Sequence, residues 1–133
     1  MPAATRTFAP DAAELERLAD AALARLPERF RALLAGVVLR VEEEAEEEVL
    51  AELGMDSPYE LTGLYSGRSL REGSQWASGE LPPMVHLYRR ALLLEWVETG
   101  VALEDLITHV IVHEVGHHFG LTDEDMHALE ADA

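Results

Sequence analysis

Residues 113–125 read HEVGHHFGLTDED, and this stretch closes a run of apolar residues with helical spacing. His113 and His117 stand four residues apart, and Glu114 directly follows the first of them. Positions i and i+4 share one helix face about 5–6 Å apart, so both imidazoles can reach one tetrahedral zinc ion. Glu114 lies about 100° further round the helix, where it can take a proton from a metal-activated water. The stretch therefore predicts a metal-dependent hydrolase site.

A catalytic zinc ion needs a third protein ligand and one open position. Gly120 is well placed to end the helix in a left-handed turn, after which the chain folds back. Asp123 would then reach the ion, and a carboxylate is an acceptable zinc ligand. His127, four residues further on, is a reserve candidate for third ligand or proton donor. The sequence leaves the choice between Asp123 and His127 open.

The segment that carries these residues, 101–119, is apolar almost all the way round a helical wheel, which is typical of a helix buried in the middle of a domain. His109 lies one turn before His113 on the same stripe. It is either a group that lines the cleft and orients a ligand or a histidine paired with a backbone carbonyl. His118 points roughly 140° away from His113, so we interpret it as a structural or surface residue.

Residues 113–123 fit the pattern HExxHxxGxxD, and two upstream segments accompany it: PYELTGLYSG at 58–67 and VHLYRR at 85–90. Together they resemble a family of small bacterial zincin-like domains, formerly a domain of unknown function and later described as a possible metallopeptidase. The resemblance covers about residues 30–128. It implies a minimal zincin fold, one Zn²⁺ per chain held by His113, His117 and Asp123, and Glu114 as general base.

The function that this resemblance implies is a zinc-dependent metallopeptidase, in which a metal-activated water attacks a peptide bond. The alternative is a zincin-fold metal-binding, regulatory or interaction module without catalytic activity, which the short chain and the missing downstream Met-turn of larger relatives favour. A third, weaker interpretation is a metal-storage protein that uses the acidic tail and holds more than one ion per chain.

The pattern of residues predicts an α+β fold with one domain over residues 1–133, of which 1–9 are flexible. A small mixed sheet would pack on the buried metal-site helix, with other helices on its flanks. We expect helices over 11–26, from the Glu-rich segment to Leu53, and over 90–99, 101–119 and 123–131; strands over 37–41, 61–65 and 85–88; and a loop over 66–82 at the mouth of the cleft.

Residues 84–89 are predicted to form the edge strand above the metal, to which a peptide substrate pairs through backbone hydrogen bonds. His86 and Tyr88 would share one face of this strand, where either can contact the substrate or stabilise an oxyanion. In the alternative arrangement, Val85 and Leu87 pack in the core while His86 and Tyr88 meet solvent.

The formal charge of −16 argues against a nucleic-acid partner and favours cationic or neutral substrates. Much of this charge lies in the Glu-rich run 42–48, which we interpret as a solvated face. The chain has no cysteine, so metal ligands must be histidines and carboxylates, and the composition fits a reducing cytoplasm. No signal peptide and no apolar run long enough to span a membrane are recognised.

Overall fold

The computed structural model describes residues 6–66 and 82–131. Most of the predicted 66–82 loop, and most of the segment 1–9 for which we predicted flexibility, therefore lies outside the described residues. The fold is α+β, as predicted. The helices are α1 (Ala12–Arg25), α2 (Glu28–Arg31), α3 (Glu47–Glu52), α4 (Arg89–Thr99), α5 (Leu103–His118) and α6 (Asp123–Ala131). Short 3₁₀ turns cover Ala32–Leu34 (η1) and Pro58–Glu60 (η2), and the strands are β1 (Val38–Glu42), β2 (Gly63–Ser66) and β3 (Met84–Tyr88).

The strands form one sheet in the order β1-β3-β2, in which β1 runs parallel and β2 antiparallel to β3. The prediction that 84–89 is the edge strand is therefore wrong, because β3 pairs with a neighbour on both sides. The alternation of apolar residues in 84–89 defines the faces of a strand but not its neighbours, which is why the sequence did not reveal this order. The strand at the edge next to α5 is β2.

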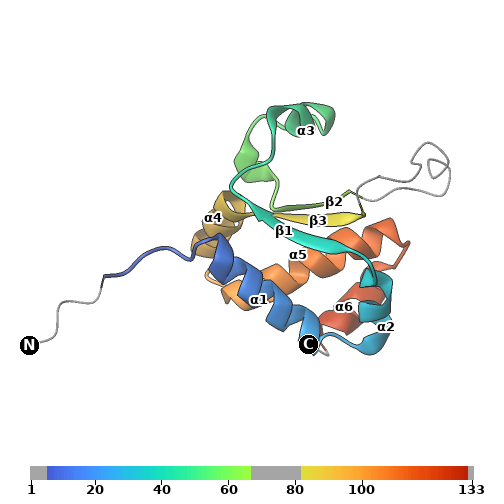
Figure 1. Cartoon of the computed structure of the whole chain (residues 1–133). Helices are drawn as coiled ribbons and strands as arrows, with labels where there is room; N and C mark the ends of the chain where they lie inside the picture. Colours follow the sequence, from blue (N-terminus) through green and yellow to red (C-terminus); the bar gives the residue numbers. More distant parts are fainter. Residues whose placement is uncertain (1–5, 67–81, 132–133) are drawn as a thin grey trace, which may run out of the picture.

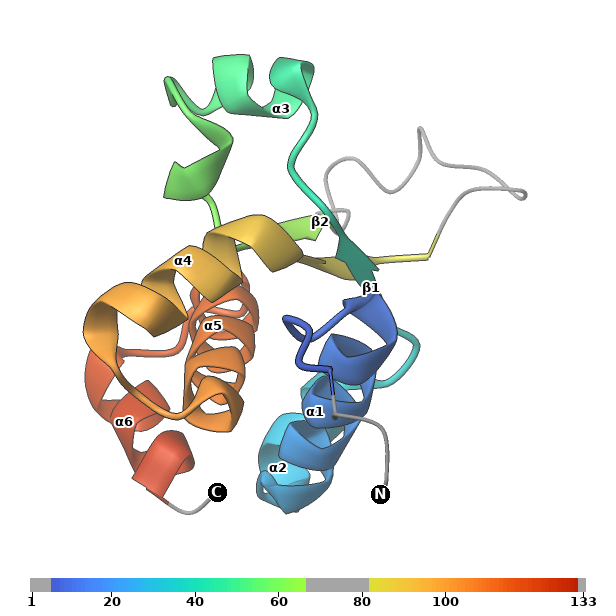
Figure 2. The ribbon, with the colours of Figure 1, turned by 90° about the vertical axis from the view of Figure 1, so that its left-hand side faces the viewer.

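The sheet separates α3, on one side, from α1, α5 and α6 on the other (Figure 1). In the view turned by 90°, α4 lies beside the sheet, and α5 lies between α6 and α1 (Figure 2). Val85 and Leu87 point into the main core, as one of the two predicted arrangements required. The prediction of a buried helix is confirmed for α5, whose fully or largely buried residues are Leu103, Leu106, Ile107, Thr108, Val110, Ile111, Val112, Val115 and Gly116.

The opposite face of β3 is covered as well. A second apolar cluster gathers between α3, the start of α4 and the sheet; its buried members are Ala45, Leu50, Leu61, Tyr88 and Ala91. Tyr88 is consequently only 3% exposed, so the expectation that it meets solvent is wrong. Its burial depends on α3, a short helix whose packing partners the sequence pattern did not identify.

The N-terminal helix begins where its sequence predicts. The carboxylate of Asp11 accepts a hydrogen bond from the backbone N–H of Glu14 at 2.8 Å and caps α1, which ends before Pro27. The short elements α2, η1 and η2 were not predicted, because three or four residues carry too little periodicity to be recognised. Within the described part of the chain, no helix combines the length and apolarity that a membrane span requires.

Gly63 allows β2 to approach α5 closely. A Cβ atom at this position would lie 2.5 Å from Cγ1 of Val110 and 3.2 Å from the carbonyl oxygen of His86. We therefore expect Gly63→Ala to destabilise the fold by about 1–3 kcal/mol, because the strand must move away from the helix. Urea unfolding measures this change. Val110→Ala should restore part of the loss when combined with Gly63→Ala, and purely additive effects would contradict a clash between these two residues.

Candidate metal centre

The end of α5 is built as its sequence predicts. Gly120 has φ of 77°, in the left-handed region that glycine adopts without strain. The N–H of Leu121 donates to the carbonyl of Gly116 at 2.8 Å, and the N–H of Gly120 donates to that of His117 at 3.2 Å. These two bonds form a Schellman motif. They reverse the chain directly after the HExxH segment.

The next helix starts only a few residues later. The backbone N–H of Asp125 donates to the hydroxyl of Thr122, and the N–H of Thr122 donates to the Asp125 carboxylate, both at 3.1 Å. Hydrogen bonds to the Asp125 carboxylate from the backbone N–H of Thr122, and then from its side chain, hold the pKa of Asp125 below its usual value. Gly116 lets α6 approach α5, since a Cβ there would lie 2.5 Å from Sδ of the buried Met126. The stretch GLTDED thus places α6 against the histidine face of α5.

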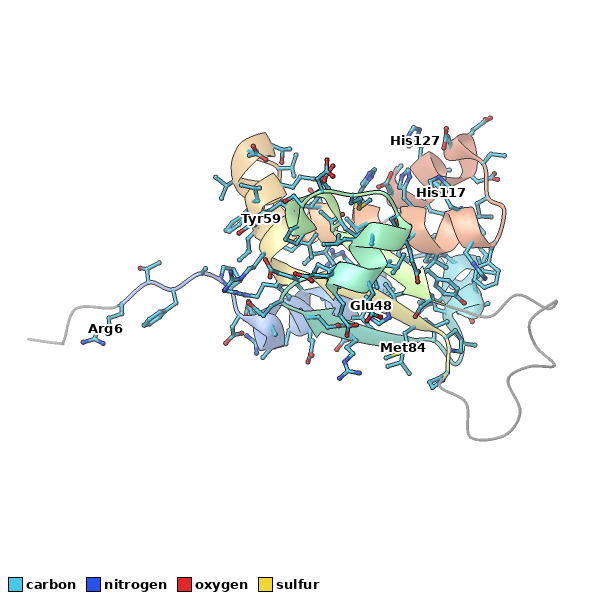
Figure 3. All side chains as sticks on the ribbon, turned by 90° about the horizontal axis from the view of Figure 1, so that it is seen from above. Arg6, Glu48, Tyr59, Met84, His117 and His127 are labelled. Carbon is cyan, nitrogen blue, oxygen red and sulfur yellow. The ribbon has the colours of Figure 1, made fainter. Side chains whose placement is uncertain are left out.

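Four histidines meet across these two helices. On α5, the ring centroids of His109 and His113 are 4.0 Å apart, and those of His113 and His117 are 5.9 Å apart. His127, on α6, lies 6.1 Å from His113 by the same measure. In the view of Figure 3, His117 and His127 lie toward the same end of the molecule. His113 is therefore the centre of the cluster.

Glu130 joins this cluster from the last turn of α6. Its Oε1 lies 2.5 Å from Nδ1 of His109, and its Oε2 lies 3.5 Å from Nε2 of His113. Ligand atoms of His109, His113 and Glu130 all lie within 4.8 Å of one another. Glu130 is not among the site residues that the sequence predicts. It stands three residues after His127 and seven after Asp123, so the stripe of α6 that carries both candidates also carries this carboxylate.

The Nε2 atom of His113 is buried and has no hydrogen-bond partner among the described residues. Burial is the main reason why the pKa of His113 is lowered, and the neighbouring His109 lowers it further, while Glu130 acts in the opposite sense. A buried polar atom without a partner is costly, and a neutral imidazole nitrogen is a metal ligand. The donor set, which consists of histidines and carboxylates, fits zinc.

Asp123 is the first residue of α6 and is exposed. The three-residue group that gathers around His113 includes Glu130 rather than Asp123. The choice between Asp123 and His127 as third ligand therefore stays a prediction. His118 points to the other side of α5, where its ring centroid lies 4.1 Å from that of Tyr65, which agrees with a structural role.

The side chain of Glu114 is half-buried next to β2, the edge strand that contacts α5. Burial raises the pKa of its carboxyl, and a hydrogen bond from the backbone N–H of Tyr65, together with the nearby His117, partly offsets this effect. A raised carboxyl pKa suits a general base that works near neutral pH. The bond to Tyr65 ties this carboxylate to β2, so a backbone group positions it.

His86 and Tyr88 lie on the face of β3 that points toward α3. Nδ1 of His86 lies 2.5 Å from Oε1 of Glu42, and its Nε2 lies 2.9 Å from the hydroxyl of Ser66. His86 is therefore already held by groups of both neighbouring strands. Its predicted contact with a substrate stays a prediction.

Burial and the negative charges of Glu42, Glu46 and Glu114 raise the pKa of Tyr88 to about 12. The folded state thus favours the neutral phenol. The contribution of this preference to the free energy of unfolding is fully present below the pKa of the unfolded tyrosine, near 10. It is lost as the pH rises toward 12, by up to roughly 2 kcal/mol. The chain has no lysine to titrate in this range.

We expect the melting temperature of Tyr88→Phe to depend less on pH than that of the wild type between pH 10 and 12.

Tyr59 provides the control for this melting experiment, because it is 46% exposed. Tyr59→Phe should keep the wild-type dependence of the melting temperature on pH. Equal alkaline behaviour of the two variants would contradict the role of Tyr88.

A cavity of about 590 Å³ opens beside the cluster, between α4, α5 and α6. His109 and Glu130 form part of its wall, and Glu95, Asp105 and Arg25 contribute further charges. It therefore lies next to the histidine cluster rather than over His117 or Glu114. Three carboxylates against one guanidinium favour a cationic or neutral occupant.

Residues 34–133 match the family model described as "Zincin-like metallopeptidase". The matched range contains all three strands, α5 and α6, and thus every residue of the cluster. A search of curated proteins found no match.

Proposed function

The chain belongs to the zincin-like metallopeptidase family, and from this premise we propose that it is a zinc-dependent peptidase whose centre lies on α5. The observation that carries the proposal is the buried Nε2 of His113, which has no hydrogen-bond partner among the described residues, beside the half-buried Glu114. A histidine nitrogen available for a ligand and a carboxylate poised to accept a proton are the two parts that such a reaction requires.

His113, His117 and Asp123 would hold the ion, as the family pattern implies, and His127 is the alternative to Asp123. When bound, zinc supplies a Lewis acid that makes water more acidic and polarises a carbonyl. No cysteine is available for a thiolate site. Histidine and carboxylate ligands can also take other divalent metals, so the choice of zinc rests on the family.

Glu114 would accept the proton of the attacking water and pass it to the leaving amine. Two features support this role. The Tyr65 N–H holds the carboxylate in place, and burial raises its pKa toward the range in which a base both accepts and returns a proton.

A peptide substrate would pair with the open edge of β2 rather than with β3. Tyr88 N–H donates to the carbonyl of Thr62, so Thr62 and Leu64 point their backbone groups toward β3. In an antiparallel pair the intervening residues, Gly63 and Tyr65, then face the open edge. Since the Tyr65 N–H already serves Glu114, this arrangement would bring the backbone of a substrate next to the base.

One observation favours the alternative, a metal-binding module without catalytic activity. A further carboxylate, that of Glu130, faces His113, and an ion with four protein ligands has no open position for water. Both functions require the metal, so metal binding does not distinguish them. Peptide hydrolysis does.

The test is digestion of a broad peptide library that contains basic, neutral and acidic side chains, followed by mass spectrometry of the products. We expect cleavage that a chelator abolishes and added zinc restores, with acidic peptides cleaved least because of the charge of −16. Metal-loaded protein that cleaves no peptide would favour the silent module.

A further inference from the structure

Glu130 belongs neither to the HExxH segment nor to the HExxHxxGxxD pattern. Yet its Oε2 lies 3.5 Å from Nε2 of His113, the buried nitrogen that has no hydrogen-bond partner in the described part of the chain. It is not a loose surface side chain. Its side chain is 23% exposed, and it extends from a helix that Met126 and Leu129 anchor in the core. Its position therefore follows from the packing of α6 on α5.

We propose that Glu130 is a further ligand of the divalent ion held by His113, and that His109 is the residue that positions it. This inference rests on the proposed function, because it requires an ion at His113. It adds a ligand that the family pattern does not contain.

The separation of the two donor atoms supports coordination. Two ligands at about 2.0–2.1 Å from a tetrahedral zinc ion lie roughly 3.3 Å from each other. Nε2 of His113 and Oε2 of Glu130 are 3.5 Å apart. One ion can thus be shared by the two atoms with little movement of either side chain, and the buried nitrogen gains the partner that it lacks.

The other carboxylate oxygen explains the place of His109. Nδ1 of His109 lies 2.5 Å from Oε1, so an N–H at this nitrogen donates to the carboxylate and fixes its orientation. Hydrogen bonds of this kind orient metal ligands, and their loss typically weakens metal binding by about 10- to 100-fold. The ring centroids of His109 and His113 are also 4.0 Å apart, so His109 contacts both Glu130 and His113.

Coordination by Glu130 would change the number of positions that remain open on the ion. With Asp123 also bound, His113, His117 and Glu130 complete four protein ligands, an arrangement without an open position. Water or substrate would then need either a fifth coordination position or the displacement of one carboxylate.

The test is zinc affinity, measured by competition with a chromophoric chelator, for wild type, Glu130→Gln and Glu130→Asp. We expect both variants to bind zinc at least about 10-fold more weakly. Glu130→Asp keeps the charge but shortens the side chain, so weaker binding by this variant shows that the position of the carboxylate matters. The control is Glu124→Gln, which removes one charge from the exposed face of the same helix and should leave the affinity unchanged.

A second readout is the visible spectrum of the cobalt-loaded protein, which depends on the number and type of ligands. Glu130→Gln should change this spectrum, whereas His109→Ala should mainly lower the affinity. Wild-type affinity and an unchanged spectrum in both Glu130 variants would overturn the inference, even if their melting temperatures fall. If zinc is still lost from His113→Ala in that case, the proposed function stands. A wild-type protein that binds no zinc would overturn both.

Discussion

Replacing Glu114 by Gln should abolish peptide hydrolysis while the protein still binds its metal. The amide has nearly the same shape but cannot accept the proton of the attacking water, and general-base catalysis contributes about 100- to 10,000-fold to rates. Glu114 lies about 100° round the helix from His113 and outside the proposed set of ligands, so we expect zinc affinity to change little. Cleavage of the best library peptide, measured beside the metal content, checks both parts.

Glu98→Gln is a matched control, because this glutamate is exposed near the end of α4 and its replacement also removes one charge. It should keep the wild-type rate. Full activity of Glu114→Gln would show that another group takes the proton, and loss of zinc from that variant would place Glu114 among the ligands.

Replacing His113 and His117 together by Ala should remove the stabilisation that zinc gives to the fold. A ligand at 100 times its dissociation constant stabilises the native state by about 2.7 kcal/mol, which corresponds to roughly 10 °C in the melting temperature of a domain of this size. We expect the wild type to show such an increase with zinc, a chelator to reverse it, and the double variant to melt at one temperature under all conditions.

His118→Ala serves as the control for this experiment. His118 stands beside His117 but packs on Tyr65, away from the cluster. Its replacement should preserve the response to zinc. An equal increase in melting temperature for the double variant would mean that zinc binds elsewhere in the acidic chain.

The parts of the fold that sequence predicts well are those determined by local chemistry. Asp11 caps α1, Gly120 ends α5 in a left-handed turn, and the apolar circumference of α5 predicts its burial. Each depends on residues within one or two turns of helix. The order of the strands does not, because β3 acquires its central place from partners more than forty residues before it and from β2.

The same distinction applies to the site. The spacing of His113, Glu114 and His117 is local to one helix, and the structure keeps these residues on it as predicted. The carboxylate of Glu130 and the backbone amide of Tyr65 come from other elements, and only the packing of α6 and β2 on α5 brings them to His113 and Glu114. The periodicity of 123–131 pointed to the face that carries Glu130, although it could not show that this face meets His109.

The most direct test of the metal centre is the metal content of the purified, untagged protein, determined by elemental mass spectrometry. We predict about one zinc ion per chain, as expected for a single site of this kind, and none in the variant that lacks both His113 and His117. A wild-type protein that holds no metal, even after incubation with zinc, would contradict the account and leave a zincin-like fold that serves another purpose.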